Sequence, residues 1–351
     1  MTDIKLSFAI AAYDRVMPLI TGEVKPDGIT LDYWEGQGRG NPFYDQIKFQ
    51  RYDVSEMSMS SYLRMRAIGW PYRILPVFHN RNFSYTNIHI RKGSGIRQGH
   101  PEDLKGKRIG IADYQMSLGL WTRGVLQMEF GVKPEDMIWY QERGEHFSHT
   151  GASTEAGLTI PKTVELHYAT KDFNSMFLNG ELDATTGLSI NLPRGSVSRS
   201  GSALTGIGRV QADLSDKHDI VTLFSNPREE AIRFFKKTGV YPPNHCTAIR
   251  ESILEEHPWI AVSLMEAFEE SKRLAIERFH QAPPTLLVFG QQYINELDEV
   301  FGPDPFPYGL KVNAKAFDMA QTFSVEQGLT ERKQPLDELF PQEIIIREER
   351  L

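Results

Sequence analysis

Residues 53–63 read DVSEMSMSSYL, and this stretch combines two structural periods. From Glu56 to Ser60, polar and apolar residues alternate, which is the period of a strand with two different faces. The residues that follow include the run YLRMRAI, which is rich in helix formers. The stretch therefore predicts a strand that leads directly into a helix, with serines at the junction. Such junctions collect backbone N–H groups and hydroxyls that suit an anion.

The segments around this junction repeat the order of strand and helix. Alternating or compact apolar runs bounded by turn signals predict strands, and amphipathic runs predict helices. The predicted strands are 4–10, 28–34, 72–78 and 85–92, and the predicted helices lie within 11–20 and 41–52. This β-α-β-α order with short connections predicts an α/β lobe.

A second α/β lobe is predicted to begin near residue 92. KRIGIA is a compact buried strand, DYQMSLGLWTRGVLQMEFG a turn and a helix that ends at Gly131, and MIWYQE a further strand. NGELDATT matches QRYDVSEM in type when Asp183 is set on Asp53, so we expect two lobes built alike. PPNHCTAIRE then returns the chain to the first lobe.

These segments predict a discontinuous first lobe, 1–90 plus 245–351, and a second lobe, 91–244. The hinge segments are predicted near 86–92 and 241–249. Two crossing segments leave a cleft between lobes, which is a usual place for a small ligand.

The C-terminal part is predicted to be helical. Ser252 and Glu255 form a capping box for one long helix through His280, whose apolar positions include Trp259 and suit docking on a core. A second helix is predicted from Asn313 to Gly328. The tail after it is expected to pack on the fold.

Two polar loops, 144–162 and 193–208, are rich in Gly, Ser and Thr. Each is predicted to be either a surface loop or a lid.

Length and composition restrict the class of protein. The chain has 351 residues, a formal net charge of −7 and a single cysteine, Cys246. The charge argues against nucleic acid or an anionic membrane as a partner, and one cysteine excludes an internal disulfide. The N-terminal stretch has no basic region followed by a continuous apolar run, so we expect a cytoplasmic protein.

No cofactor or metal is expected from the motifs. We find no GxGxxG after a strand, no Walker loop, no HExxH and no close Cys/His set. Metal binding by His146 and His149, three residues apart in a polar loop, remains an alternative. His79, His89 and His100 are expected to be surface or packing residues.

Several segments together resemble the 4,5-dihydroxyphthalate decarboxylase family. The segments are AYDRVMPLITGEVKPDGITLDY, YDVSEMSMSSYL, LPVFHNRNF, DLKGKRIGIADYQMSLGLWTRGVLQMEFGV, HCTAIRE and GPDPFPYGL. The resemblance covers roughly 1–140 and 220–340 and weakens across 141–215. It implies a two-lobed type II periplasmic-binding-protein-like fold with an interlobe cleft. It also implies a cytoplasmic enzyme that removes CO2 from a hydroxylated aromatic carboxylate without oxidation.

A substrate with adjacent carboxylates needs cations and oriented donors. Arg15, Arg81 and Arg123 each follow a strand or lie near a helix start, and the arginine fork pairs bidentately with a carboxylate. A surface or interlobe salt bridge is the alternative for each arginine. Tyr114 and Gln115 follow a strand and are predicted to line the cleft.

The serines of the opening stretch are predicted to bind the substrate. Ser58, Ser60 and Ser61, with the N–H groups of the helix start, would hold one carboxylate or a ring hydroxyl. The alternative is an ordinary helix N-cap, a position that serine commonly fills.

Decarboxylation of a phenolic acid needs an acid and a base. A base takes the phenolic proton, an acid protonates the ring carbon that bears the carboxylate, and CO2 leaves as the ring regains aromaticity. Glu56 is a candidate base, or a partner for a cleft arginine, and Asp14 is a candidate base or orients Arg15. His245 is predicted to carry the proton transfer while Cys246 points into the core, because imidazole titrates near neutrality.

Three functions remain open at this stage. The first is a non-oxidative decarboxylase that acts on 4,5-dihydroxyphthalate or a close analogue. A solute-binding protein for an aromatic or other small organic anion would use the same fold, and so would a biosynthetic enzyme acting on another small molecule. The expected partner is a small aromatic carboxylate, with no nucleic acid and no membrane; association into a homo-oligomer stays open.

Overall fold

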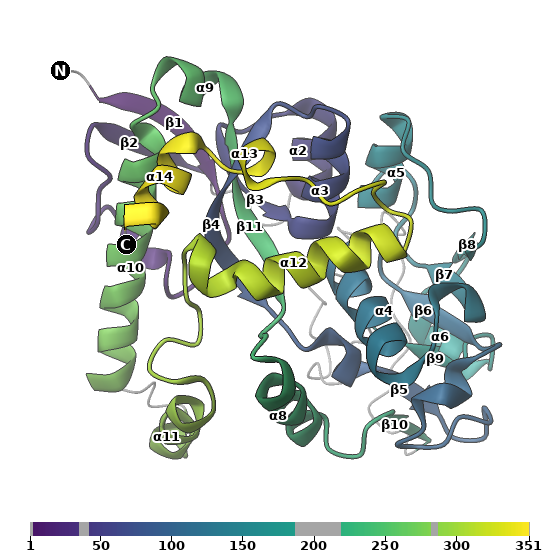
Figure 1. Ribbon diagram of the computed structural model, residues 1–351. Helices are drawn as coiled ribbons and strands as arrows, with labels where there is room; N and C mark the ends of the chain where they lie inside the picture. Colours follow the sequence, from purple (N-terminus) through teal and green to yellow (C-terminus); the bar gives the residue numbers. More distant parts are fainter. Residues whose placement is uncertain (1–2, 35–41, 187–218, 282–286, 351) are drawn as a thin grey trace.

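A computed structural model of the chain describes residues 3–34, 42–186, 219–281 and 287–350. It contains two mixed β-sheets, each covered by helices (Figure 1). The first sheet has the order β2-β1-β3-β11-β4. Its strands are β1 (Ile4–Ala9), β2 (Ile29–Tyr33), β3 (Val54–Ser58), β4 (Tyr72–Arg81) and β11 (Pro243–Arg250). β1 runs parallel to β2 and β3, whereas β11 runs antiparallel to β3 and β4.

The second sheet has the order β10-β5-β9-β6-β7-β8. Its strands are β5 (His89–Arg91), β6 (Arg108–Ile111), β7 (Ile138–Gln141), β8 (Glu165–Tyr168), β9 (Ala184–Thr185) and β10 (Ile220–Thr222). Between the two sheets the chain crosses after β4 and again before β11. The predicted division at residues 90 and 244 stays a prediction.

The helices fall into two groups along the chain. Those that precede β4 or follow β11 are α1 (Met17–Ile20), α2 (Pro42–Phe49), α3 (Met59–Ala67), α9 (Glu251–Glu256), α10 (Ile260–Gln281), α11 (Gly290–Phe301), α12 (Leu310–Glu326), α13 (Leu336–Leu339) and α14 (Gln342–Arg350). Those between β4 and β11 are α4 (Ser117–Phe130), α5 (His149–Glu155), α6 (Phe173–Leu178) and α8 (Pro227–Thr238), with the 3-10 turns η1 (Ser84–Asn87), η2 (Pro101–Leu104) and η3 (Pro134–Asp136).

The predicted junction of strand and helix is confirmed at the end of β3. The strand stops at Ser58, which is the N-cap of α3 and accepts a hydrogen bond from the N–H of Ser61 at 3.5 Å. Met59 and Ser60 are therefore helical and do not continue the strand. This places the first turn of α3 at the end of a central strand of the sheet.

Helix α12 connects the two halves of the molecule, the half built on the first sheet and the half built on the second. It runs from the first sheet across to α4 (Figure 1), and it packs on both α3 and α4. Phe323 of α12 meets Trp121 of α4 edge to face, with ring centroids 5.5 Å apart. One apolar cluster therefore extends from Met57 of β3 through Trp121 to Phe323.

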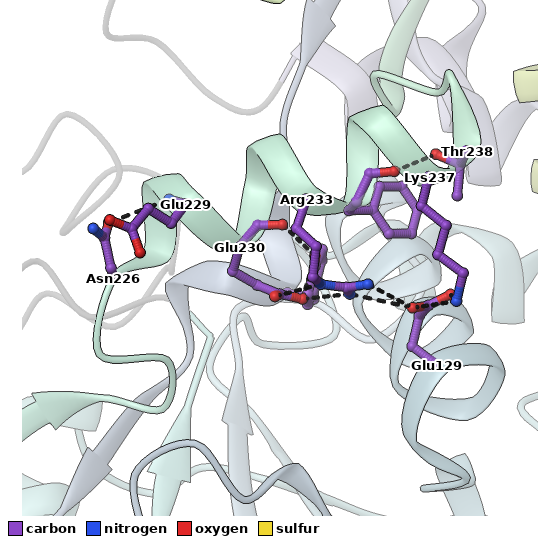
Figure 2. Close-up of polar contacts among 9 residues, drawn as sticks. Glu129, Asn226, Glu229, Glu230, Arg233, Lys237 and Thr238 are labelled. Carbon is purple, nitrogen blue, oxygen red and sulfur yellow. Dashed lines mark hydrogen bonds and ion pairs between the residues drawn. The ribbon is translucent and has the colours of Figure 1, made fainter.

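Helix α8, which precedes the return strand β11, is anchored on α4 (Figure 2). Arg233 and Lys237 of α8 both form ion pairs with Glu129 of α4, whose side chain is only 6% exposed. Glu230 pairs with Arg233 and also accepts a hydrogen bond from the Tyr85 hydroxyl at 2.9 Å. The start of the return crossing is therefore fixed to the second half of the molecule.

The prediction of one long capped helix through His280 is wrong. Helix α9 ends at Glu256 and α10 begins at Ile260, because Pro258 cannot continue a helix and disfavours helical backbone before it. The N-cap of α9 is Arg250, which makes no side-chain cap bond, so the predicted Ser252–Glu255 box does not start it. Trp259, expected to dock on the core, is 43% exposed.

Other boundaries also differ from the prediction. Helix α12 begins at Leu310, three residues before the predicted Asn313, whose amide instead donates to the carbonyls of Pro307 and Gly309. The predicted strand 85–92 is a 3-10 turn followed by the short β5. Loop 144–162 contains the largely buried helix α5, and loop 193–208 lies outside the described residues. In the described ranges, no helix is both long and apolar enough to cross a membrane.

Candidate active site

Glu56 and His245 form a close pair on neighbouring strands. Thr247 lies opposite Glu56 in the β3–β11 register, so His245, two residues away, projects from the same face of the sheet. The Nδ1 atom of His245 lies 2.5 Å from Oε1 of Glu56. Cys246, between His245 and Thr247, faces the other way and is fully buried, as predicted.

The Glu56 carboxylate is buried but well supplied with donors. Besides His245, it accepts from the Ala11 N–H at 3.0 Å and from the Tyr13 hydroxyl at 2.7 Å. Burial by itself would raise the pKa of Glu56, but the hydrogen bond and charge of His245 outweigh it and lower this pKa to about 2. An ionised carboxylate can only accept, so Nδ1 of His245 carries a proton and donates it. This leaves Nε2 as the atom of His245 that can exchange a proton.

His245 is accessible whereas Glu56 is not. The His245 side chain is 23% exposed, and within the described ranges no hydrogen bond occupies its Nε2. Glu56 therefore orients and polarises His245, and His245 faces outward. A carboxylate that fixes the tautomer of a partly exposed imidazole can support acid–base chemistry.

A second histidine lies beside this pair. Nε2 of His79 is 2.6 Å from the Thr247 hydroxyl, and the Tyr13 ring stacks on the His79 ring at 5.9 Å. Burial lowers the pKa of His79 to about 4, although the charge of Glu56 opposes this shift. Burial, together with the charge of Glu56, raises the pKa of Tyr13. His79 is thus a neutral packing residue behind the pair, as predicted.

The buried neutral histidines predict a pH dependence of stability. The pKa values of His79 and His149 are about 4 in the folded chain, against about 6.5 for an exposed imidazole. Between these values the unfolded chain binds more protons, so the free energy of unfolding falls as pH decreases from about 6.5 to about 4. Each histidine is expected to contribute about 2 kcal/mol of this loss between pH 6.5 and 5.

Denaturant unfolding at several pH values measures this loss directly. His79→Gln removes one titrating group, so its stability is expected to fall less steeply below pH 6.5 than that of the unmodified chain. Parallel curves for the two proteins would contradict the buried neutral state of His79.

The serine junction joins the two halves of the molecule. The hydroxyls of Ser58 and Ser117 are 2.9 Å apart, and the Ser117 hydroxyl accepts from the N–H of Ser60 at 3.1 Å. Ser61 reaches Nδ1 of His149 at 2.9 Å. Ser58 therefore does fill the N-cap position, and the hydroxyl of Ser60 is buried without a partner among the described residues. Substrate binding by the three serines stays a prediction.

Arg15 lies near the Glu56–His245 pair but makes its contacts elsewhere. Its guanidinium donates to the carbonyl of His79 and to Asp14, and it stacks on Phe306 at 3.7 Å. It lines a pocket of about 150 Å³ whose walls, as the structure describes them, do not include Glu56. Asp14 is 72% exposed beside Arg15, so its geometry fits the orienting role better than that of a base.

Arg81 and Arg123 are held inside the protein. Arg81 donates to the carbonyls of Tyr241 and Pro307 and to the side chain of Asn313. Arg123 stacks on Tyr114 at 3.7 Å and binds Gln327 through Nε, and its two terminal nitrogens are buried without partners in the part of the chain that the structure describes. Among the residues that the structure describes, neither guanidinium hydrogen-bonds to the Ser58–Ser61 turn, so their roles in substrate binding stay predictions.

Tyr114 and Gln115 are both fully buried. Gln115 accepts a hydrogen bond from Arg64 at 2.5 Å and donates to Ser153 at 2.6 Å. Tyr114 packs edge to face on Trp139. In this conformation both residues belong to a packed interior, and the predicted lining role is not tested.

Three site residues were not predicted from the sequence. Tyr13 directly precedes the Asp14–Arg15 pair, so its place in a strand-to-helix turn was an available signal. Ser117 and Phe43 gave no local signal, because each joins the site only when segments distant in the chain meet. The ring of Phe43 lies 4.9 Å from the His245 ring and 5.3 Å from the His149 ring.

The alternative of a metal site at His146 and His149 finds no supporting cluster. Among the described residues, no group of three or more His, Cys, Asp or Glu side chains could hold a metal ion.

Comparison with solved structures identifies the fold. The sulfonate-binding protein SsuA of Escherichia coli, a periplasmic protein, aligns over 98% of this chain and all of its own, with a TM-score of 0.53 and 13% identity. SsuA of Methylobacillus flagellatus aligns over all of this chain and 95% of its own, with a TM-score of 0.53 and 12% identity. The protein thus has the two-lobed α/β fold of periplasmic binding proteins, as predicted.

Comparison with curated proteins identifies the family. A 4,5-dihydroxyphthalate decarboxylase of Comamonas testosteroni is 31% identical over 345 residues, covering 97% of each chain. One of Pseudomonas putida is 37% identical over 190 residues, covering 53% of this chain and 71% of its own. No family model matches the chain. The chain belongs to the 4,5-dihydroxyphthalate decarboxylase family, which confirms the predicted resemblance.

Proposed function

We propose that this protein is a non-oxidative carboxy-lyase that acts on 4,5-dihydroxyphthalate or a close hydroxylated aromatic carboxylate. The observation that supports the proposal is the Glu56–His245 pair, because it is a partly exposed imidazole oriented by a buried carboxylate. The names of the two curated relatives support the same reaction class and substrate.

The proposed reaction consumes one proton and releases one CO2. The phenolic hydroxyl para to the departing carboxylate loses its proton, and electron density moves into the ring. Nε2 of protonated His245 gives a proton to the ring carbon that bears the carboxylate. The bond from this carbon to the carboxylate then breaks, its electron pair restores the aromatic ring as a phenolate, and CO2 leaves. The phenolate takes back the proton that the base removed, so the net uptake is the one proton supplied by His245.

In this scheme Glu56 acts through His245. Its ionised carboxylate stabilises the imidazolium before the transfer and holds the ring orientation throughout. Its oxygens are already taken by Ala11, Tyr13 and His245, so it is poorly placed to contact the substrate itself. The assignment of Glu56 or Asp14 as the base for the phenolic proton stays a prediction. The cytoplasmic location and the formation of a homo-oligomer also stay predictions.

Incubation of the purified protein with 4,5-dihydroxyphthalate and related hydroxybenzoates tests this proposal. We expect CO2 release with the dihydroxyphthalate or a close analogue, and no release with phthalate, which lacks the hydroxyl. A thermal-shift screen run in parallel separates catalysis from binding. Stabilisation by these acids without CO2 release would contradict the carboxy-lyase and favour a solute-binding protein.

A further inference from the structure

His149 is a buried imidazole with one nitrogen unused. It is the first residue of α5 and is 2% exposed. Nδ1 lies 2.9 Å from the Ser61 hydroxyl, whereas Nε2 is buried and has no hydrogen-bond partner in the described part of the chain. Whichever tautomer is present, one buried polar group of the ring is left unsatisfied, which destabilises the fold.

The position of His149 is rigidly determined. Its N–H donates to Asp113 at 2.5 Å, and the hydroxyl of Thr150 donates to the same carboxylate at 2.8 Å. The N-cap Ser148 accepts from Gly151 at 2.8 Å. The unpartnered nitrogen therefore belongs to a residue held by its backbone and by Ser61, which is the condition for a preorganised ligand contact.

The ring of Phe43 connects His149 to the acid–base pair. Its centroid is 5.3 Å from the His149 ring and 4.9 Å from the His245 ring, edge to face in both cases. The charge of His245 is also close enough to contribute to the lowered pKa of His149, to which burial contributes most. The two imidazoles therefore lie around one aromatic side chain, whose ring can pack against an aromatic ligand.

We propose that His149 is a substrate-binding residue that hydrogen-bonds an anionic oxygen of the aromatic carboxylate through Nε2, while Ser61 holds its ring through Nδ1. This inference rests on the proposed function and extends it. The substrate ring packs against Phe43. The ring carbon that bears the departing carboxylate faces His245, and an anionic oxygen of another substituent meets His149. Nδ1 accepts from Ser61 in this state, so that Nε2 carries the proton and donates it.

The proposal gives segment 144–162 a role in recognition. This segment brings His149 to Ser61 of the serine junction. In this arrangement His149, from the second half of the molecule, recognises one substituent of the ring. His245, from the first half, carries out the proton transfer.

Two substitutions at His149 separate the roles of its nitrogens. Asparagine keeps a polar group near the Nδ1 position and loses Nε2, whereas glutamine places its amide near the Nε2 position. We expect His149→Asn to raise KM for 4,5-dihydroxyphthalate about tenfold or more, the range of one hydrogen bond to a charged group, with kcat changed much less. His149→Gln should restore KM to within about threefold of the unmodified protein.

His89 offers a matched control. It is also largely buried, with an Nδ1 atom that has no partner among the described residues, but it lies on β5, away from Phe43. His89→Asn should leave KM unchanged. Thermal unfolding of each variant checks that it is folded, and the glutamine rescue distinguishes a lost contact from a damaged fold.

The binding of phthalate, measured by calorimetry, separates failure of this inference from failure of the proposed function. Phthalate has the carboxylates but lacks the hydroxyls needed for decarboxylation. Weaker phthalate binding by His149→Asn, with binding retained in His149→Gln, supports the contact even if no substrate is decarboxylated. Equal KM and equal phthalate affinity in the unmodified protein and His149→Asn would overturn it, and so would equal losses in both His149 variants.

Discussion

Replacement of His245 by asparagine or alanine is expected to lower turnover by about a hundredfold or more, while ligand binding persists. His245 holds the only nitrogen of the Glu56–His245 pair that is free to exchange a proton, so its removal leaves no group at that position to protonate the ring carbon. Asparagine can keep the hydrogen bond to Glu56 through its amide, so the loss reflects chemistry more than local structure. The measurement is the rate of CO2 release at saturating substrate.

Two results would count against this role for His245. Turnover near the unmodified rate in both variants would make Glu56 or Asp14 the better candidate for the proton transfer. An equal loss in His89→Asn, at a histidine on β5 of the second sheet, would show that the effect is not specific to the site. A direct measurement of ligand affinity separates a chemical role from a binding role.

Replacement of Glu56 by glutamine is expected to reduce kcat by about 10²- to 10⁴-fold, although Glu56 does not contact the substrate in our scheme. The carboxylate accepts from Ala11, Tyr13 and His245 at once. An amide has one acceptor oxygen and a donor nitrogen, so it cannot fix the Nδ1–H tautomer in the same way, and it offers no charge to an imidazolium.

Asp53 provides a matched carboxylate for comparison. It lies just before β3 and accepts from the backbone and hydroxyl of Ser7 and from Arg250, without touching a histidine. Asp53→Asn should therefore cost stability while turnover per folded molecule stays near that of the unmodified protein. Similar kinetic losses in Asp53→Asn and Glu56→Gln would indicate that Glu56 supports the sheet and not the chemistry.

Local sequence was sufficient to predict most elements of the fold. The alternation at residues 4–10 and the serine-rich junction at the end of β3 are direct consequences of side-chain period and helix capping. The prediction of one long helix is wrong because Pro258 interrupts the helical run, although the Ser252–Glu255 pattern is typical of a helix start. Helix α5 was missed because Gly, Ser and Thr in segment 144–162 are typical of a loop, whereas burial and the Asp113 cap stabilise a helix there.

The candidate site could be predicted only where one residue carried its own signal. His245 lies in the segment that follows two prolines and returns the chain to the first lobe, and Glu56 lies in a strand of clear alternation. Both could therefore be predicted although they are 189 residues apart. The pairing itself follows from the antiparallel register of β3 and β11, which no local pattern encodes. In sequence, Arg81 and Arg123 cannot be told apart from an arginine that binds a carboxylate. In the structure Arg81 donates to backbone carbonyls, and Arg123 contacts the Gln327 amide and the Tyr114 ring.

Decarboxylation of 4,5-dihydroxyphthalate in D2O, followed by NMR of the product and by CO2 release, tests the central claim most directly. We expect one CO2 per substrate and one deuterium on the ring carbon that carried the carboxylate, with both signals falling about a hundredfold or more in His245→Asn. Binding of the acid by the unmodified protein with no CO2 release and no deuterium at this carbon would contradict the account.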